Sequence, residues 1–267
     1  MAHSPLAPVT ALEDNLWSLG RALGSGRDGR VIDTETRLVI HTPVRSPPYN
    51  GVWRFFDEGD ASLLEQANQV LAGFRERGVP AIWFVHPTAP DELDKALEDA
   101  GLTLADELSG MVRALDDLPP LPPPPEGIEL REATTADTAT WLELISWRYG
   151  LERESSSPYL TSIFGRAIGS GIIRLWIALL NGEPVSKAAI HCHRGVAGVY
   201  GVATTEAGRG RGLASLLTLH GLHAARNDGM HSSVLHATPM ARALYERLDY
   251  RCVAPFRVWA SPGTPHL

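Results

Sequence analysis

The sequence predicts a mixed α/β (α+β) protein in which helices cover a β-sheet, arranged in two halves. Three observations support this prediction. A run of prolines interrupts the chain near its middle. After it, two tight turns join three apolar segments, and helical and strand patterns then alternate. The first half shows part of the same alternation, which indicates that the two halves share an architecture.

The boundary between the halves is the segment 119–125, which reads Pro-Pro-Leu-Pro-Pro-Pro-Pro. Consecutive prolines lack amide hydrogens and have a fixed φ, so this run can join neither a helix nor a strand ladder. It is typical of a stiff linker, with a ligand for a proline-binding module as the alternative. We therefore expect one domain at 1–118, a linker at 119–126 and a second domain at 127–267.

The second half begins with Ile128–Ala133, which alternates as a half-buried strand does. Thr134 and Asp137 are spaced as a capping pair and predict the start of a helix that passes through Trp147. A further helical pattern covers Tyr159–Ile168. We expect a strand followed by two helices here.

Three strands follow in close succession, at 172–180, 185–193 and 196–204. Asn181-Gly182 between the first two is a strong signal for a two-residue hairpin turn. Arg194-Gly195 between the next two is equally short. Because such turns join neighbouring antiparallel strands, the pattern predicts a meander.

The remainder of the second half alternates. Apolar residues recur at helical period over Leu213–Asn227. The elements predicted after this helix are a strand at Ser233–Ala237, a helix at Pro239–Leu248, and closing strands at Tyr250–Val253 and Arg257–Trp259. The first half contains a partial echo of this order, with strands at 37–42 and 52–56, a helix at 61–77, a strand at 80–86 and a helix at 91–100.

The loop before the helix at Leu213 carries the most informative residues. Arg209, Gly210, Arg211 and Gly212 lie between the end of a strand and the start of that helix. A helix N-terminus exposes unpaired amide hydrogens and a partial positive charge, so it is a natural site for a pyrophosphate. Glycines let phosphate oxygens reach the backbone, and arginines add charge. A solvated glycine-rich turn is the alternative interpretation.

Two nucleotide-binding motifs fit this loop less well. A Rossmann site places GxGxxG after the first strand of a parallel unit, with an acidic residue at the end of the next strand. Here the loop follows a meander, and the next strand ends in His236 and Ala237. A P-loop would need GxxxxGK followed by Ser or Thr, which the sequence lacks.

The segment 209–214 resembles the signature of the GNAT superfamily of acyl-CoA-dependent N-acyltransferases: Arg or Gln, two free positions, Gly, one free position, then Gly or Ala. The order of elements from 128 to 259 is similar to that family throughout. The resemblance implies a twisted mixed sheet with helices on both faces, and a gap between two splayed strands that holds the pantetheine arm of acetyl-CoA. It implies the following acetyl-CoA-binding residues: Val202, Ala203 and Thr204 for pantetheine, and Arg209, Gly210, Arg211, Gly212, Leu213, Ala214 and Ser215 for pyrophosphate.

A second segment, 238–250, resembles the family pattern N-x-x-A-x-x-x-Y-x-x-x-G followed by Phe or Tyr. Thr238 stands where Asn is usual and Asp249 where Gly is usual. Thr can still cap a helix, and Asp tolerates a left-handed backbone. The resemblance implies that Tyr245 is the catalytic general acid for the leaving thiolate, with a core tyrosine as the alternative. A backbone amide near Val202 is expected to polarise the thioester carbonyl.

The general base is not evident, because the strand at 196–204 contains no acidic residue. His191 and His193 lie two apart on the neighbouring strand and share one face of it, so either is a candidate. Glu132 and Glu154 are further candidates. Direct attack by an amine that loses its proton to solvent also fits the sequence.

The first half has no counterpart of the phosphate loop. The corresponding position reads Asp57-Glu58-Gly59-Asp60, which is acidic and would repel pyrophosphate. Residues 1–118 resemble the degenerate half of a tandem GNAT protein. We expect the first two helices of the second half, together with loops, to build the acceptor pocket. Residues 1–118 are expected to help shape that pocket without binding CoA.

Composition narrows the function classes. The chain has 267 residues, a net charge of −7 and two cysteines in no zinc-binding pattern, so neither a nucleic-acid partner nor a metal is expected. It has no signal-peptide pattern and no apolar run long enough to span a membrane, which favours the cytoplasm.

The function that these patterns favour is an acetyl-CoA-dependent N-acetyltransferase that moves its acyl group directly to a primary amine of a small molecule or protein. A CoA-binding regulatory module without turnover is one alternative, and a purely structural or interaction protein is another. The sequence leaves the acceptor, the acyl chain and the oligomeric state, monomer or homodimer, undetermined.

Overall fold

The computed structural model describes residues 6–151, 153–262 and 264. Its helices are α1 (Pro8–Gly24), α2 (Leu63–Glu76), α3 (Leu93–Asp99), α4 (Thr138–Tyr149), α5 (Arg153–Ser170), α6 (Leu213–Asn227) and α7 (Pro239–Glu246), with short 3-10 turns η1 (Thr135–Asp137) and η2 (Glu206–Gly208). Its strands are β1 (Arg30–Asp33), β2 (Arg37–His41), β3 (Gly51–Phe55), β4 (Ile82–Val85), β5 (Thr103–Ala114), β6 (Ile128–Glu132), β7 (Ile173–Leu180), β8 (Glu183–His193), β9 (Val196–Thr204), β10 (Ser232–Ala237) and β11 (Arg251–Ala260).

The predicted meander is confirmed, and its turns show why it forms. Strands β7, β8 and β9 pair antiparallel in that order. Asn181 and Gly182 have φ of 52° and 89°, and Arg194 and Gly195 have φ of 48° and 79°. Positive φ at both central residues is the mark of a type I′ turn, whose twist matches that of the strands it joins.

The predicted capping pair is also confirmed. The Asp137 carboxylate accepts hydrogen bonds from the Thr134 backbone N–H at 2.8 Å and the Thr134 hydroxyl at 3.0 Å. Arg131 adds two hydrogen bonds of 2.6 and 2.7 Å. Bonding to the arginine is the largest effect, and it holds the pKa of Asp137 well below its usual range. These contacts fix the start of the helical pair α4 and α5.

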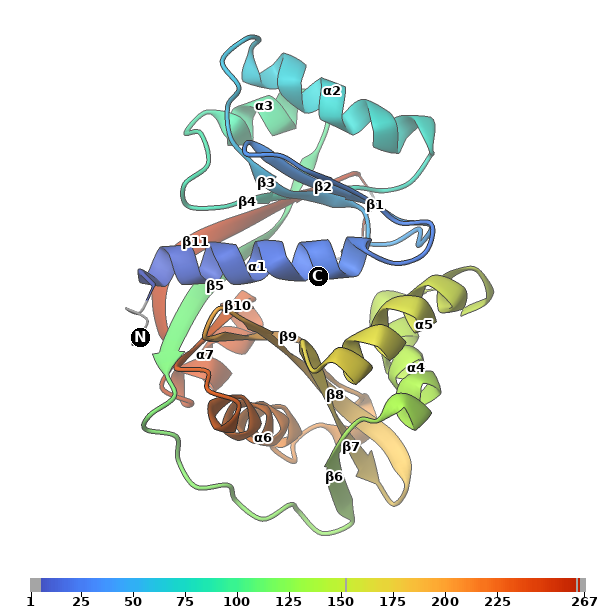
Figure 1. Ribbon diagram of the computed structural model, residues 1–267, viewed down its shortest axis with the longest axis vertical. Helices are drawn as coiled ribbons and strands as arrows, with labels where there is room; N and C mark the ends of the chain where they lie inside the picture. Colours follow the sequence, from blue (N-terminus) through green and yellow to red (C-terminus); the bar gives the residue numbers. More distant parts are fainter. Residues whose placement is uncertain (1–5, 152, 263, 265–267) are drawn as a thin grey trace.

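One sheet runs through both halves, in the order β1-β2-β3-β4-β11-β5-β10-β9-β8-β7-β6 (Figure 1). The halves exchange their last strands. Strand β5, from the first half, pairs with β10, whereas β11, from the end of the chain, pairs with β4. The two exchanged strands pair with each other in the middle. The division at 119–126 stays a prediction, and the parts that it separates share a sheet.

Three elements were missed by the sequence analysis, which placed nothing at 8–24, 30–33 or 103–114. These segments form α1, β1 and β5. In α1, Leu12, Leu16, Leu19 and Leu23 recur at helical spacing and could have signalled the helix. In β5, acidic residues and a glycine interrupt the alternation of apolar residues, so the pattern of this strand is weak.

The closing strands were also predicted in the wrong form. The segments 250–253 and 257–259 were expected to be separate, but they belong to the single strand β11. Its pairing with β5 shifts register between Cys252 and Ala254. Such a bulge bends a strand without ending it, and it disturbs the side-chain alternation on which the prediction depended.

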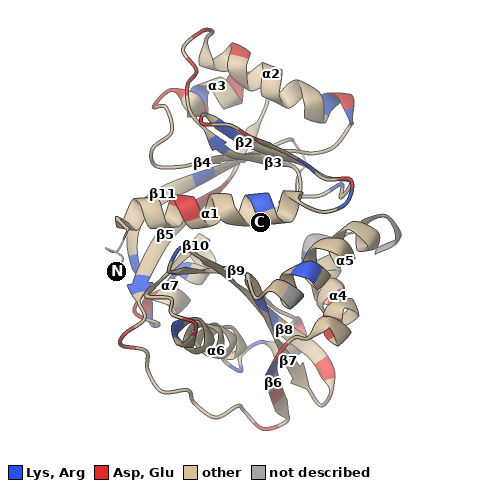
Figure 2. Cartoon of the chain, in the orientation of Figure 1, with Lys and Arg blue, Asp and Glu red and all other residues tan. Residues whose placement is uncertain are grey.

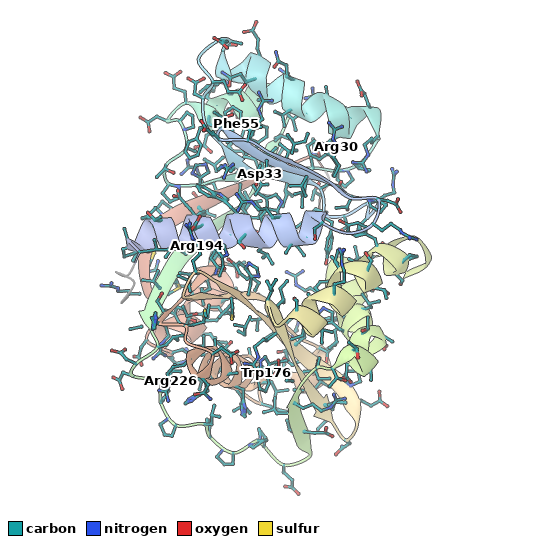
Figure 3. The ribbon with its side chains drawn as sticks, in the orientation of Figure 1. Arg30, Asp33, Phe55, Trp176, Arg194 and Arg226 are labelled. Carbon is teal, nitrogen blue, oxygen red and sulfur yellow. The ribbon has the colours of Figure 1, made fainter. Side chains whose placement is uncertain are left out.

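Helices cover both faces of the sheet. Side chains of α1, α4 and α5 share a core with Ile82 and Phe84, whereas α2 and α3 pack on Trp83 and Val85 from the opposite face. Helices α6 and α7 extend that opposite layer over the second half. Figure 3 marks this layer at Phe55 under α2 and α3, and at Trp176 beside α6.

The feature that positions the site is the separation of β9 from β10. These strands pair in parallel from Val196↔Ser232 to Val199↔Leu235, and the pairing then ends. Strand β9 nevertheless continues to Thr204. The backbone of its last residues therefore has no partner strand on the β10 side, which leaves a gap in the sheet.

Charged residues of both signs are interspersed along both halves (Figure 2). None of the helices in the described part of the chain is long and apolar enough to cross a membrane. Both cysteines, Cys192 and Cys252, are free thiols.

Candidate active site

A cavity of about 910 Å³ lies where β9 and β10 separate. Its lining includes Trp53 and Phe84, which belong to the core on the α1 face, and Tyr245, which belongs to the core under α6 and α7. Because these cores lie on opposite faces of the sheet, the cavity passes through the gap between the strands. A ligand could thus reach from one layer of helices to the other.

The residues expected to hold pantetheine line this cavity. Val202, Ala203 and Thr204 are among its lining residues. The strand bulges just before them: Gly201 has φ of 58°, and the register with β8 shifts between Lys187 and Ala189. A bulge turns backbone groups out of the regular ladder, so it can direct an amide or carbonyl toward a ligand.

The start of α6 is open. Gly210 and Gly212 have φ of 76° and 72°, and no atom of the described residues lies within 4 Å of where a Cβ would be at either. No side chain caps the helix. The Leu216 N–H donates to the Gly212 carbonyl at 3.0 Å. The amides of the three residues between them point along the axis at the exposed end of the helix, where an anion is stabilised.

The structure therefore sorts the predicted acetyl-CoA-binding residues into two groups. Val202, Ala203, Thr204 and Arg209 line the cavity. Gly210, Arg211, Gly212, Leu213, Ala214 and Ser215 lie in the turn and first helical residues that follow. The side chain of Leu213 is 2% exposed and packs into the core, so this residue offers a ligand only its backbone. Both arginines are exposed.

Tyr245 lies on α7 and lines the same cavity. Its side chain is 8% exposed and packs edge-on against Tyr250, with ring centroids 5.8 Å apart. Burial raises the pKa of the Tyr245 phenol. The side chain is thus neutral at physiological pH, which is the form that can donate a hydrogen bond or a proton.

The two departures from the family pattern around Tyr245 have different outcomes. Thr238 is the N-cap residue of α7, but its hydroxyl makes no capping hydrogen bond, contrary to the expectation. Asp249 has φ of 59°, so it does adopt the left-handed backbone expected in place of glycine. The turn after α7 is therefore preserved.

None of the described candidates for the general base lines the cavity. His191 is 1% exposed, and its Nε2 lies 2.9 Å from a serine hydroxyl of α1. Burial is the main cause that lowers the pKa of His191 to about 4. His193, whose ring is stacked against it, also lies outside the cavity. Glu132 is hydrogen bonded at 2.8 and 2.5 Å to an arginine of β7, and the Glu154 side chain lies outside the described residues.

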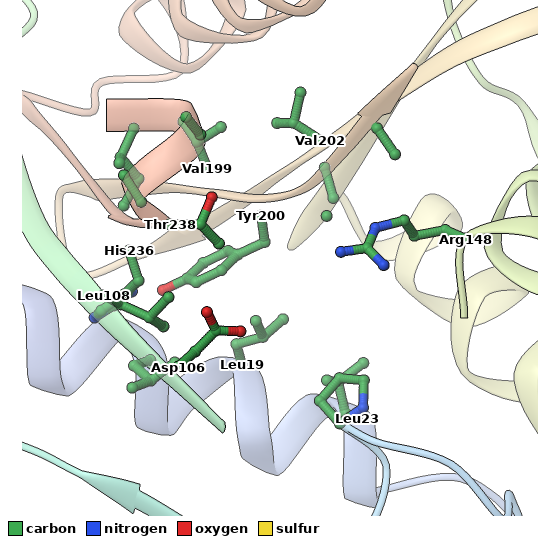
Figure 4. A pocket seen from close by; sticks show the side chains of 18 of the residues that line it. Leu19, Leu23, Asp106, Leu108, Arg148, Val199, Tyr200, Val202, His236 and Thr238 are labelled. Carbon is green, nitrogen blue, oxygen red and sulfur yellow. The ribbon is translucent and has the colours of Figure 1, made fainter. Parts of the chain in front are cut away.

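The polar side chains that line the cavity and that the sequence analysis did not single out include Asp106, Arg148 and Tyr200 (Figure 4). Asp106 carries the one carboxylate among the described lining residues. The Tyr200 hydroxyl donates a 2.8 Å hydrogen bond to Asn15 of α1, and burial raises its pKa. Asp106 escaped notice because it lies on β5, the strand that the sequence analysis missed.

His236 is another lining residue, but its chemistry is hidden. Both ring nitrogens are buried and have no hydrogen-bond partner among the described residues. The ring stacks near Tyr200 and meets Phe256 edge-on at 4.4 Å. Burial lowers the pKa of His236 to about 3, so the imidazole is neutral. Since neither nitrogen is exposed to the cavity, this residue would have to move before it could contact a substrate.

The glycine-rich turn, the gap in the sheet and Tyr245 all lie within the part of the chain whose sequence matches a known protein family. The family described as acetyltransferase (GNAT) domain matches residues 171–252, from β7 to the start of β11. This part of the chain is a GNAT-type acetyltransferase domain. No curated protein matches its sequence.

Solved structures share the fold of this chain over nearly its whole length. A GCN5-related N-acetyltransferase from Kribbella flavida is 18% identical, with a TM-score of 0.65, over 95% of this chain and 96% of that chain. One from Sphaerobacter thermophilus is 15% identical, with a TM-score of 0.60, over 100% and 96%. A tandem GNAT protein from the clavulanic acid biosynthesis pathway is 14% identical, with a TM-score of 0.60, over 96% and 97%. This structural likeness shows the fold, and it bears out the predicted tandem GNAT fold.

Proposed function

We propose that this protein transfers an acetyl group from acetyl-CoA directly to the primary amine of an acceptor with a bulky apolar body. The observation that supports this most is that the open start of α6, the gap beside Val202–Thr204 and Tyr245 meet at one cavity. Each of these features has a structural explanation on its own. Their convergence favours a site that binds a long thioester and acts on its acyl end.

The acetyl-CoA side of the site uses mainly backbone groups. The diphosphate binds the amides from Gly210 to Ser215, with Arg209 and Arg211 supplying charge-assisted contacts. The pantetheine arm lies in the gap along Val202–Thr204, where β9 has lost its partner. This arrangement brings the thioester toward Tyr245.

The acceptor side draws on the first half of the chain. The cavity is lined there by apolar side chains of α1, β3 and β4, including Leu19, Trp53 and Phe84. Trp141 and Phe164 of α4 and α5 add aromatic surface. Such walls favour an acceptor with an aromatic or branched aliphatic body. This supports the expectation that residues 1–118 shape the acceptor pocket.

Asp106 carries the one carboxylate among the described residues that line the cavity, and we assign it a role in binding and deprotonating the acceptor. An acceptor amine arrives as an ammonium ion, and the Asp106 carboxylate stabilises it in a cavity whose other walls are largely apolar. The amine must lose a proton before its lone pair can attack. Asp106 receives that proton, directly or through water, and then releases it to solvent.

The reaction then balances as follows. The neutral amine nitrogen forms a bond to the thioester carbon, and the carbonyl oxygen takes the displaced electron pair. The Val202 N–H stabilises this oxyanion. The carbon–sulfur bond breaks as the carbonyl reforms, and the Tyr245 phenol protonates the leaving thiolate. The amine nitrogen then loses its second proton toward Asp106, and solvent returns a proton to the Tyr245 phenolate. The products are an amide and free CoA.

The test is release of free thiol from acetyl-CoA in the presence of a panel of amines graded from small and polar to large and apolar. We expect turnover to rise with apolar bulk. Asp106→Asn should lower kcat/KM for the acceptor by about 100-fold, because the ammonium loses its counter-charge. Glu107→Gln is the matched control, since this exposed neighbour lies on the opposite face of β5.

Three outcomes discriminate among the functions. Turnover with Asp106-dependent acceptor use supports the proposal. Binding of acetyl-CoA in calorimetry, with no thiol release for any amine, would favour a regulatory module instead. Absence of CoA binding would exclude both and leave an interaction protein.

A further inference from the structure

A buried lysine lies directly behind the part of β9 that faces the cavity. The side chain of Lys187, on β8, is 2% exposed. Its Nζ donates a 2.6 Å hydrogen bond to the carbonyl oxygen of Gly201 and lies 5.1 Å from the centre of the Trp141 ring. Burial, with a smaller contribution from Arg148, lowers the pKa of Lys187 to about 7. Burying this group is costly, so its hydrogen bond merits a functional explanation.

The geometry of the peptide bond connects this lysine to the cavity. The Gly201 carbonyl and the Val202 N–H belong to the same planar peptide group, and in a trans peptide they point in opposite directions. A carbonyl directed at Lys187 therefore directs the Val202 N–H away from it. Val202 lines the cavity, on the stretch of β9 that β10 no longer covers.

The bulge makes this orientation possible. Gly201 has φ of 58°, which a residue with a side chain adopts only with strain. A Cβ at this position would lie 3.2 Å from the Lys187 Nζ. The glycine thus allows both the turned peptide and the close approach of the lysine.

The hydrogen bond also changes the strength of the N–H donor. An ammonium donor on a carbonyl oxygen, present as the pH falls toward and below the lowered pKa of Lys187, draws electron density from the peptide nitrogen, and hydrogen bonds in such a chain strengthen one another. The Val202 N–H becomes more positive on the side where the thioester oxygen would gain charge. In a site that excludes water, a fixed dipole of this kind stabilises a transition state more than it would in water.

We propose that Lys187 is a positioning residue for catalysis, which orients and polarises the Gly201–Val202 peptide so that its N–H stabilises the oxyanion of acyl transfer. The proposal rests on the function proposed above. The alternative is a purely structural lysine that only closes the core over Trp141. That role would affect stability but not the electronic state of a bound carbonyl.

The test combines kinetics with spectroscopy on Lys187→Met, which keeps most of the side-chain volume and removes the charge. We expect kcat to fall by about 10- to 100-fold, with KM for acetyl-CoA changed less than about twofold. The second readout is the carbonyl stretch of a carbon-13-labelled ketone analogue of acetyl-CoA, measured by isotope-edited infrared spectroscopy. Binding to the wild type should lower this frequency, and the Met variant should lose most of that shift.

Two further variants keep the test decisive. Lys187→Arg retains a cation and should recover most of the lost kcat and of the infrared shift, even if Lys187→Met folds poorly. Ser186→Ala is the control for charge. It removes a 3.0 Å hydrogen bond that the uncharged Ser186 hydroxyl donates to the Ala203 carbonyl, which lies on β9 as Gly201 does. It should leave both readouts near those of the wild type.

The outcomes separate this proposal from the proposed function. If Lys187→Met lowers the melting temperature but keeps kcat and the carbonyl shift, Lys187 is structural and the proposal is overturned. Equal effects of Ser186→Ala and Lys187→Met would overturn it as well. If the wild-type protein does not bind the analogue at all, the proposed function itself fails, and this inference with it.

Discussion

The two halves contain the same strand–helix junction in opposite chemical states. In the first half, β3 leads into α2, and Ser62 and Glu65 form a complete capping box at the helix start. In the second half, β9 leads into α6, whose N-cap is Gly212 and has no side-chain cap. The acidic loop 57–60 precedes the first helix, whereas arginines precede the second. One junction satisfies its own amide hydrogens, and the other leaves them to a ligand.

The acidic residues of the first junction are also occupied within the chain. Glu58 forms a salt bridge with Arg37, and Asp57 accepts a 2.7 Å hydrogen bond from Gln66. These contacts stabilise the turn rather than offer it to a partner. The comparison teaches that a helix start becomes an anion site through the absence of a capping side chain, together with local positive charge.

The largest expected effect comes from giving α6 a side-chain cap, as α2 has, and so removing the difference between the two junctions. Gly212→Asp places a carboxylate at the bare helix start, where it both occupies the amides and repels phosphate. We expect acetyl-CoA affinity to fall by about 100-fold or more, equivalent to about 3 kcal/mol. Isothermal titration calorimetry measures this directly.

The matched control is the same substitution in the other junction. Gly59 also has positive φ, at 78°, and open space where its Cβ would be. Gly59→Asp should therefore have a similar backbone cost and leave acetyl-CoA affinity unchanged. An equal loss of affinity in both variants would contradict the distinction drawn between the junctions, as would two CoA equivalents bound per wild-type chain.

The next largest effect concerns two neighbouring phenols. Tyr245 lines the cavity, whereas Tyr250 lies in the core and its hydroxyl is 2.5 Å from that of Ser233. Tyr245→Phe should lower kcat by about 10- to 100-fold with little change in acetyl-CoA binding, because it removes only the proton donor. Tyr250→Phe should lower the melting temperature and leave kcat intact. Steady-state kinetics with both variants tests the assignment, and similar kcat values in the two would contradict it.

Much of the second half could be predicted because its signals are local. The positive φ of Asn181-Gly182 and the capping contacts of Thr134 with Asp137 are determined within a few residues, and both were confirmed. The loop at 209–212 is equally local, since its glycines and charges precede the helix directly. Local backbone chemistry of this kind is readable without knowledge of the fold.

The acceptor side could not be predicted, because its residues come together only through long-range pairing. Asp106 reaches the cavity because β5 crosses into the second half, an exchange that nothing in the sequence of either half specifies. From the sequence alone, Lys187 is an ordinary lysine within a strand. Its position beside the bulge of β9 becomes evident only from the pairing of β8 with β9. His191 and His193 share a strand face as expected, but α1, which was missed, covers that part of the sheet.

A further comparison concerns how the free energy of unfolding depends on pH. It contrasts a buried histidine that has an acidic partner with buried histidines that lack one. His86, in the first half, lies 3.1 Å from the Glu13 carboxylate. His191 and His236, in the second half, have no such partner among the residues that the structure describes, and burial is the main cause that lowers their pKa from 6.5 to about 4 and about 3. Between those values and 6.5 the unfolded state binds more protons. Stability is therefore fully present above pH 6.5 and is lost as the pH falls below it.

Urea denaturation at pH 7.5 and pH 5.5 measures this loss, which we expect to be about 1 kcal/mol for each of the two histidines. His41 adds to it in the same sense, since burial is the main cause that lowers its pKa to about 4. His236→Phe keeps an aromatic ring between Tyr200 and Phe256 and should flatten the pH dependence by its share. An unchanged slope in this variant would show that His236 is already protonated or solvated in the folded protein.

The smallest expected effect comes from opening the closed junction. Ser62→Ala removes the side chain that accepts the Glu65 N–H at 3.3 Å, and loss of such a cap costs about 1 kcal/mol. We expect a lower midpoint in thermal denaturation but still a single CoA site in calorimetry, because the acidic loop 57–60 remains in front of α2. A second, weaker CoA site in Ser62→Ala would mean that the cap alone separates the two junctions. Adding Asp57→Asn and Glu58→Gln to that variant then measures what the charges contribute, since each step brings the first junction closer to the second.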